Sequence, residues 1–251
     1  MKKKMVSLVL CACVALAAAG CGGSKKFNNP EKGGTLIMAT NAYFEPYEYY
    51  EGENVVGIDV EIATAIAEKL GMTLEVEDME FDSIIAAVNS GKAHIGAAGM
   101  TVTEDRLQNV DFTDPYTTAT QVIIVQEGSE IAGADDLSGK KIGVQLGTTG
   151  DIYASDVEGA TIEQYNKGMD AVQALANGII DAVIIDNEPA KQFVNKAEGL
   201  KILDEEFVIE EYAIAIAKGN EELLDDVNKA LDAIIADGTI KGIIDKYITA
   251  E

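Results

Sequence analysis

Short apolar runs alternate with stretches of helical spacing along most of this chain, and this alternation restricts it to an α/β fold. Strands that are separated by helices predict parallel β-α-β units. The first set of segments comprises strands at 35–39, 73–76 and 93–98 and helices at 58–70 and 81–89. A loop at 40–54 precedes the first helix.

The same alternation restarts near residue 120. The second set comprises strands at 121–125, 142–144, 181–186 and 213–217 and helices at 171–177, 188–197, 221–236 and 239–248. Each set is short for a domain by itself, and no repeat appears at the periods typical of solenoids. We therefore predict two α/β lobes on one chain, each a mostly parallel sheet flanked by helices, with a crevice between them.

The first twenty residues have the pattern of an export signal: three lysines, an apolar run and then small residues. The run is shorter than the roughly 20 residues of a membrane-spanning helix. The segment around Cys21 resembles the lipobox of bacterial lipoproteins, although Ala18 replaces the usual leucine. We expect a signal peptide at 1–20 and a lipidated Cys21 with a flexible tether through 34; cleavage after Ala19 without lipidation is the alternative.

Charge and cysteine content exclude several classes of partner. Removal of residues 1–20 leaves 16 basic residues against 43 acidic ones, a formal net charge of −27. Such a chain repels the phosphate backbone, so we expect no nucleic-acid partner. Cys11 and Cys13 lie inside the predicted signal, and a mature chain would therefore hold Cys21 alone. This excludes a disulfide framework and a cysteine-based metal site, and we expect no metal or cofactor.

Arg106 is the only arginine in the chain. Its planar guanidinium can bind a carboxylate through two parallel hydrogen bonds, which lysine cannot do. Two hydroxyls and a glycine precede it in Gly99-Met100-Thr101-Val102-Thr103-Glu104-Asp105-Arg106. We interpret the segment as a clamp for a carboxylate. Alternatively, Thr103 caps a short helix and Arg106 pairs with an acid in its first turn.

Polar and aromatic residues follow several of the predicted strands, at the edge where open parallel sheets bind ligands. They are Asn41 and Phe44 after the first strand, Gly99, Thr101 and Arg106 after the third, Gln145, Thr148 and Thr149 after 142–144, and Asp186 at the end of 181–186. Arg106 with Thr101 and the donors of the 147–150 turn would hold a carboxylate, Asp186 an ammonium group, and Phe44 would form an apolar wall. This combination predicts a site for a free amino acid.

Each of these assignments has a structural alternative. Asp186 could cap the helix at 188–197, the turn at 147–150 could simply connect a strand to a helix, and Phe44 could cover the sheet edge. His94, the sole histidine, lies in an apolar setting and is more typical of a structural residue than of a catalytic one.

From Thr35 onward the chain resembles the bacterial extracellular solute-binding proteins that deliver polar amino acids to ATP-driven importers. The motifs that carry the resemblance are Gly57-Ile58-Asp59-Val60-Glu61-Ile62-Ala63, the Gly99 to Arg106 segment, Val110-Asp111-Phe112-Thr113-Asp114-Pro115-Tyr116, and Gly238-Thr239. The resemblance implies a periplasmic-binding-protein-like fold with hinges near 118–120 and 210–213. One lobe would comprise 35–118 with 213–251, and the other 119–212.

The resemblance also implies a ligand pose. The carboxylate would bind Arg106, Thr101 and the backbone near Thr149; the ammonium would bind Asp186, Thr101 and the Gly99 carbonyl; and the side chain would lie against Phe44 and Phe81, with Asn41 and Gln145 at its polar end. Binders of basic amino acids often have a carboxylate in place of Asn41. We therefore place a neutral polar ligand slightly ahead of a cationic one, although Glu45 or Glu80 could restore a preference for cations.

The function implied is ligand capture without catalysis: a monomeric lipoprotein on the outer face of the cell membrane that delivers a polar L-amino acid to the permease subunits of an ABC importer. One alternative is a sensor that docks to a receptor. Another is a dehydratase of cyclic aromatic-amino-acid precursors, with Glu45 as the best candidate for the general acid that such an enzyme needs.

Overall fold

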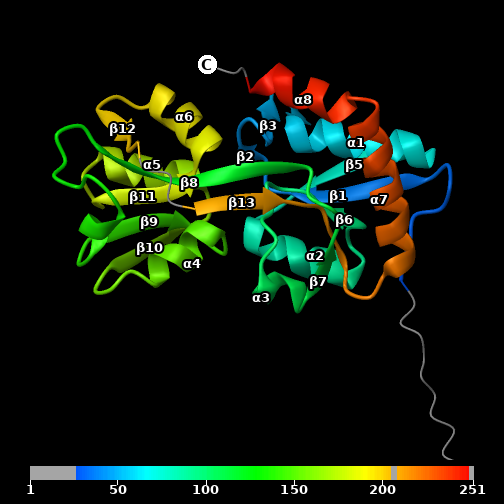
Figure 1. Ribbon diagram of the computed structural model, residues 1–251, viewed down its shortest axis with the longest axis horizontal. Helices are drawn as coiled ribbons and strands as arrows, with labels where there is room; N and C mark the ends of the chain where they lie inside the picture. The colour runs from blue at the N-terminus through cyan, green and yellow to red at the C-terminus, as the bar shows by residue number, and fades with distance from the viewer. Residues whose placement is uncertain (1–26, 205–207, 249–251) are drawn as a thin grey trace, which may run out of the picture.

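The computed structural model describes residues 27–204 and 208–248. The predicted signal peptide and Cys21 lie outside the described residues. Two α/β lobes lie side by side, as Figure 1 shows, and this arrangement confirms the predicted fold class. Within the described part of the chain, the helices are too short or too polar to cross a lipid bilayer.

The first lobe is built on a five-stranded sheet with the order β5-β1-β6-β14-β7. β1 pairs in parallel with β5 and β6, whereas β14 runs antiparallel to β6 and β7. The strands are β1 (Thr35–Thr40), β5 (Thr73–Asp78), β6 (Ile95–Gly96), β7 (Val110–Phe112) and β14 (Ala215–Ala217). The helices are α1 (Ile58–Leu70), α2 (Ile84–Ser90), α3 (Glu104–Leu107), α7 (Glu221–Ala236) and α8 (Thr239–Tyr247), with a 3-10 turn η1 at Phe81–Ser83.

The second lobe has a sheet with the order β10-β9-β11-β8-β12, to which β13 adds by pairing with β8. β9, β10 and β11 are parallel, and β8 is antiparallel to its partners. The strands are β8 (Thr117–Gln126), β9 (Lys141–Gln145), β10 (Thr161–Tyr165), β11 (Ala182–Asp186), β12 (Leu200–Ile202) and β13 (Val208–Tyr212). The helices are α4 (Thr149–Ser155), α5 (Gly168–Ala176) and α6 (Asn187–Lys196), with a 3-10 turn η2 at Ala134–Leu137.

Two paired antiparallel strands connect the lobes. The chain leaves the first lobe along β8 and returns along β13, which continues into β14 (Figure 1). Glu210 lies opposite Ala119 in their register, so the residues expected to act as hinges face one another on these strands. A pair of strands hydrogen-bonded in this way can bend near the crossing while each sheet stays intact, which is the geometry of a hinged closure.

The packing of α1 illustrates how sequence pattern becomes structure. Ile58, Ile62 and Ile66 recur at helical spacing and are fully buried in the core of the first lobe. Each contributes roughly 1.5–3 kcal/mol through removal of its side chain from water. The helix ends at Gly71, whose φ of 71° is the left-handed conformation that glycine adopts without strain.

The segment predicted as a loop at 40–54 contains a small antiparallel sheet instead. Its strands are β2 (Tyr43–Phe44), β3 (Glu48–Glu51) and β4 (Asn54–Val56). Strands of two to four residues are too short to show a period in the sequence. Conversely, the predicted strand at 93–98 is paired only at Ile95–Gly96. A Cβ on Gly96 would lie 2.7 Å from Ile84, so the small residue there allows α2 to pack closely on the sheet.

Candidate functional site

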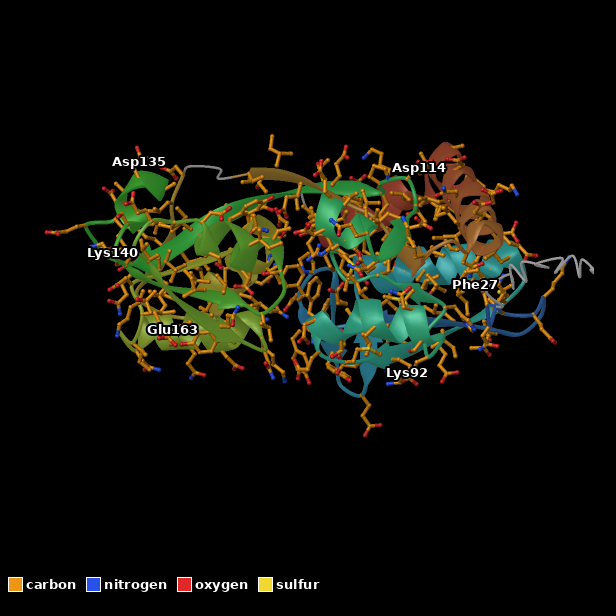
Figure 2. The ribbon with its side chains drawn as sticks, turned by 90° about the horizontal axis from the view of Figure 1, so that it is seen from below. Phe27, Lys92, Asp114, Asp135, Lys140 and Glu163 are labelled. Atoms are coloured by element: carbon orange, nitrogen blue, oxygen red, sulfur yellow. The ribbon has the colours of Figure 1, made fainter. Side chains whose placement is uncertain are left out.

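A cavity lies between the lobes, and the space in it that atoms do not fill, including solvent at its mouth, is about 310 Å³. All nine residues predicted to bind a ligand line it, and three further residues complete the lining. The full set is Asn41, Phe44, Glu48, Phe81, Ala98, Gly99, Thr101, Arg106, Gln145, Thr148, Thr149 and Asp186. Charged side chains cover the outer surfaces of both lobes, where Lys92 and Asp114 lie on one lobe and Asp135, Lys140 and Glu163 on the other (Figure 2).

Both sheets contribute the carboxyl ends of their strands to this cavity. In the first lobe Asn41 follows β1 and Thr101 follows β6, and in the second Gln145 ends β9 and Asp186 ends β11. Open parallel sheets bind ligands outside the carboxyl ends of their strands. The residues at these strand ends come from distant parts of the sequence and meet at this cavity. Gly99 has a φ of 52°, and a Cβ there would lie 3.1 Å from both Phe44 and Tyr212. Glycine is thus favoured at this wall of the cavity by its backbone conformation and by the close approach of the two rings.

Arg106 lies on α3 with only 7% of its surface exposed. Its Nη1 donates to the Thr101 carbonyl at 2.7 Å, and its Nη2 reaches across to the Gly147 carbonyl of the second lobe at 3.1 Å. The guanidinium carbon lies 5.3 Å from the centre of the Phe81 ring. Thr103 does cap the helix, because its hydroxyl accepts from the Arg106 backbone N–H at 3.2 Å. The cap and the cavity-facing guanidinium therefore coexist.

Burial lowers the pKa of Arg106, while the charges of Glu210 and Asp186 act in the opposite direction. A guanidinium stays protonated in proteins, so this arginine is a fixed positive charge in a buried position. Two of its five N–H groups are committed to backbone carbonyls, and the remaining donors are available to an anion.

Asp186 ends β11 and is 6% exposed. It occupies the N-cap position of α6, but its side chain makes no capping hydrogen bond, so the capping alternative does not describe the carboxylate. Instead, its Oδ1 accepts from the hydroxyl of Tyr212 on β13. Burial and then the charge of Glu210 raise the pKa of Asp186 to about 7. A cation beside this carboxylate would favour its ionised form.

Thr101 differs from its expected role. Its hydroxyl donates at 2.9 Å to Oε2 of Glu210, a 3% exposed residue of the returning strand β13. Gln121 of β8 donates to the same oxygen at 3.0 Å and lies 3.4 Å from the Thr149 hydroxyl. A hydroxyl has one proton to donate, so Thr101 cannot also donate to a ligand carboxylate. Its oxygen can still accept from an ammonium group.

The polar end of the cavity joins the two lobes. Gln145 donates to the Asn41 side-chain oxygen at 2.9 Å and to the Asn166 carbonyl at 3.2 Å. Asn41 in turn donates to the Met79 carbonyl at 2.8 Å. These bonds fix both amides in one orientation and present amide groups to whatever lies beside them.

Further contacts cross the crevice at its rim. The Lys196 ammonium lies 2.5 Å from the Glu45 carboxylate, and the Lys167 ammonium lies 3.4 Å from the centre of the Tyr43 ring. Together with the bond from Arg106 to Gly147, they join the two lobes. The structure therefore shows the lobes closed on each other.

The sequence did not single out Glu48. This residue of β3 is 1% exposed and lines the cavity, whereas Glu45 pairs with Lys196 outside the lining and Glu80 is exposed. The signal that could have found it is weak: Glu48 stands between two tyrosines, and it is the one buried residue in a strand of four. His94 is buried away from this cavity, and its Nδ1 accepts from the Ile37 backbone N–H at 2.9 Å, as a structural histidine does.

Comparisons with known proteins show which proteins this chain is similar to. Residues 36–250 match the family described as bacterial extracellular solute-binding proteins, family 3. The arginine-binding extracellular protein ArtP of Bacillus subtilis (strain 168) is 37% identical, over 99% of each chain. An ancestral arginine-binding protein, solved with arginine and also with glutamine, is 42% identical with a TM-score of 0.82; with arginine it covers 85% of this chain and 98% of its own, and with glutamine 86% and 98%. An ancestral amino-acid-binding protein described as a precursor of cyclohexadienyl dehydratase is 34% identical, with a TM-score of 0.79 and coverage of 85% and 95%.

Proposed function

Because this chain belongs to the bacterial extracellular solute-binding proteins of family 3, we propose that it captures a polar L-amino acid between its lobes and presents the closed form to the permease of an ABC importer. The lobes that close would be residues 35–118 with 213–251 on one side and 119–212 on the other. Closure by hinge bending is an established way for two-lobed proteins to enclose a ligand.

The observation that carries the proposal is the placement of one positive and one negative side chain from different lobes on the same cavity. Arg106 comes from α3 of the first lobe and Asp186 from the end of β11 in the second. No ion pair joins these two residues in the described part of the chain, so both are available to a zwitterion. A charge buried without a partner costs several kcal/mol, which explains why a ligand with both charges is favoured.

The proposed pose follows from the remaining hydrogen-bonding capacity of the lining. The ligand carboxylate binds Arg106 and the backbone near Thr149. The ammonium binds Asp186, the Thr101 oxygen and the Gly99 carbonyl. The side chain lies between Phe44 and Phe81 and points toward Asn41 and Gln145, whose amides can pair with a polar terminus.

We propose arginine as the first candidate ligand and glutamine as the second. Relatives are described as arginine-binding proteins, and one ancestral protein was solved with either arginine or glutamine. These observations reverse the slight preference for a neutral ligand that the absence of a carboxylate at Asn41 suggested.

The location and the absence of catalysis belong to the proposal as well. Lipidation at Cys21 would hold the protein on the outer face of the cell membrane. The predicted flexible tether through residue 34 is wrong for residues 27–34, which pack on the first lobe: Asn29 accepts from Asn220 at 2.7 Å, and the Gly33 backbone N–H donates to the Gly71 carbonyl at 3.0 Å. The likeness to a dehydratase precursor supports one competing function, for which Glu48 or Asp186 would be the general acid in place of Glu45. Incubation with prephenate or arogenate and assay for the aromatic product tests that alternative.

A thermal-shift screen of the chain from residue 22 onward against the common amino acids tests the proposed function. A ligand at one thousand times its Kd stabilises the folded state by about 4 kcal/mol, which corresponds to an increase in Tm on the order of 10 °C for a chain of this size. We expect the largest shift with arginine. The absence of a shift with every amino acid at millimolar concentration contradicts the proposal.

A further inference from the structure

Two carboxyl groups lie side by side at the wall of the ligand cavity. Glu48 comes from β3 and Asp59 from the first turn of α1, and each is 1% exposed. Asp59 Oδ2 accepts from the Gly99 backbone N–H at 2.8 Å and from the Tyr116 hydroxyl at 2.7 Å. Asp59 therefore holds the backbone at Gly99, whose glycine forms part of the cavity wall.

A proton between the two carboxyl groups accounts for their remaining oxygens. As plain carboxylates, Asp59 Oδ1 and Glu48 Oε2 would both be buried without a hydrogen-bond partner. The two side chains nevertheless lie within hydrogen-bonding reach of each other. An ionised carboxylate only accepts, whereas a protonated carboxyl group has one O–H to donate. One proton between the two groups satisfies both oxygens.

The neighbours of the pair decide which residue holds the proton. Asp59 already accepts two hydrogen bonds, and bonds of that kind stabilise the ionised form. We propose that Glu48 and Asp59 share one proton at neutral pH, with Glu48 as the donor, and that this pair positions the Gly99 backbone in the ligand cavity. Glu48 is thus a positioning residue that acts through Asp59.

The charged and titratable groups around the pair support the same assignment. Burial, the charge and hydrogen bond of Asp59, and the charge of Asp186 across the cavity raise the pKa of Glu48 well above its usual value. Burial raises the pKa of Asp59 to about 6, while the hydrogen bonds that Asp59 accepts from Gly99, Tyr116 and Glu48 act to lower it. The hydroxyls of Tyr47 and Tyr116 face the same acids and stay protonated, because burial and those charges raise their pKa values far above neutrality. The guanidinium of Arg106 lines the same cavity.

The proposal rests on the proposed function only where it concerns the ligand. A neutral Glu48 removes one negative charge from the cavity, so the ammonium of a ligand would be paired by Asp186 and by the oriented carbonyl of Gly99. The proton shared by Glu48 and Asp59 exists whether or not an amino acid binds. Measurements on the ligand-free protein therefore separate a failure of this inference from a failure of the function.

Infrared spectroscopy of the ligand-free mature protein tests the shared proton directly. At pH 8 we expect wild type to show the C=O band of a protonated carboxylic acid, and Glu48→Gln to lack it. Glu45→Gln is the matched control, because Glu45 lies at the rim and pairs with Lys196, and this variant should keep the band. An identical band in wild type and Glu48→Gln overturns the proposal, as does its absence from wild type.

The pH dependence of unfolding gives a second, independent readout. Folded Glu48 keeps its proton above about pH 4.3, where the unfolded residue loses it, so the folded state binds one proton more. For each pH unit above that value, the unfolding equilibrium constant of wild type should therefore rise about tenfold relative to that of Glu48→Gln, until Glu48 ionises. A difference between the two proteins that stays constant from pH 5 to 8 overturns the proposal. Glu48→Ala, which offers Asp59 no donor, should bind the ligand more weakly than Glu48→Gln.

Discussion

The hydroxyl of Thr101 donates a hydrogen bond of 2.9 Å to Glu210, and this bond connects the wall of the ligand cavity to the strand that returns the chain between the lobes. Because the single hydroxyl proton is used in this way, the Thr101 oxygen has only lone pairs to offer the cavity. Glu210 thereby determines which pole of a zwitterion Thr101 can contact, namely the ammonium group.

Replacement of Thr101 by valine should weaken amino-acid binding by roughly 10- to 100-fold, because a hydrogen bond to a charged group is worth about 1.5–3 kcal/mol. Valine keeps the shape of threonine but has no oxygen. Thr101→Ser is the matched control and should stay within a few-fold of wild type. Titration calorimetry with arginine measures both. Equal affinities for the valine and serine variants would contradict a role for the hydroxyl.

Replacement of Arg106 by lysine keeps the charge but should raise the Kd for the amino acid by about 100-fold or more. The guanidinium holds the Thr101 and Gly147 carbonyls with two of its N–H groups and still offers others in one plane to a carboxylate. An ammonium group is a compact charge without that planar geometry. Calorimetry on Arg106→Lys measures the loss, and circular dichroism provides the check that the variant is folded. Affinity within tenfold of wild type would rule out the bidentate clamp.

The sequence predicted correctly those cavity residues that lie at the ends of strands. Asn41, Gln145 and Asp186 each follow a strand of clear apolar pattern, and the topology of parallel sheets brings such positions to one edge whatever their separation along the chain. Helices with a strong period and a glycine end, such as Ile58–Leu70, were predicted at their observed bounds.

The parts that sequence reasoning missed depend on contacts between distant segments. Thr101 and Glu210 are 109 residues apart, and no local pattern indicates that a hinge strand supplies the partner of the hydroxyl. Glu48 lies in a strand of four residues, too short to show a period, and it points into the cavity because β2, β3 and β4 pair among themselves. Phe81 was placed by resemblance alone, since a 3-10 turn shows no pattern that assigns its ring to a cavity.

Binding should weaken as the pH falls below about 7, by up to about tenfold per pH unit, because an ammonium group needs the ionised form of Asp186. Burial and the charge of Glu210 raise the pKa of this carboxyl to about 7, so at pH 6 most of the ligand-free protein carries the proton and must release it on binding. Calorimetry in buffers of different ionisation enthalpy measures that release.

Two variants test the assignment of this proton. Glu210→Gln keeps an acceptor for Thr101 but removes the neighbouring charge, so the midpoint of the affinity profile should move to lower pH. Asp186→Asn should bind weakly and release no proton. An unchanged midpoint in Glu210→Gln would show that another group causes the pH dependence. The raised pKa of Asp186 also predicts that this group costs the ligand-free protein stability as the pH rises from about 4 to 7.

Ligand preference should respond most strongly to Asn41, whose oxygen accepts from Gln145 while its nitrogen donates to the Met79 carbonyl. In Asn41→Asp the nitrogen is replaced by a second acceptor facing that carbonyl, and a buried negative charge is added. A cationic ligand side chain compensates this charge, whereas a neutral one leaves it unpaired. We expect the ratio of the Kd for glutamine to that for arginine to rise about tenfold or more, because charge-assisted hydrogen bonds are about twice as strong as neutral ones.

Glu80→Gln, which changes an exposed acid outside the cavity lining, should alter this ratio less than twofold. A ratio in Asn41→Asp equal to that of wild type would mean that the ligand side chain does not reach Asn41 and Gln145.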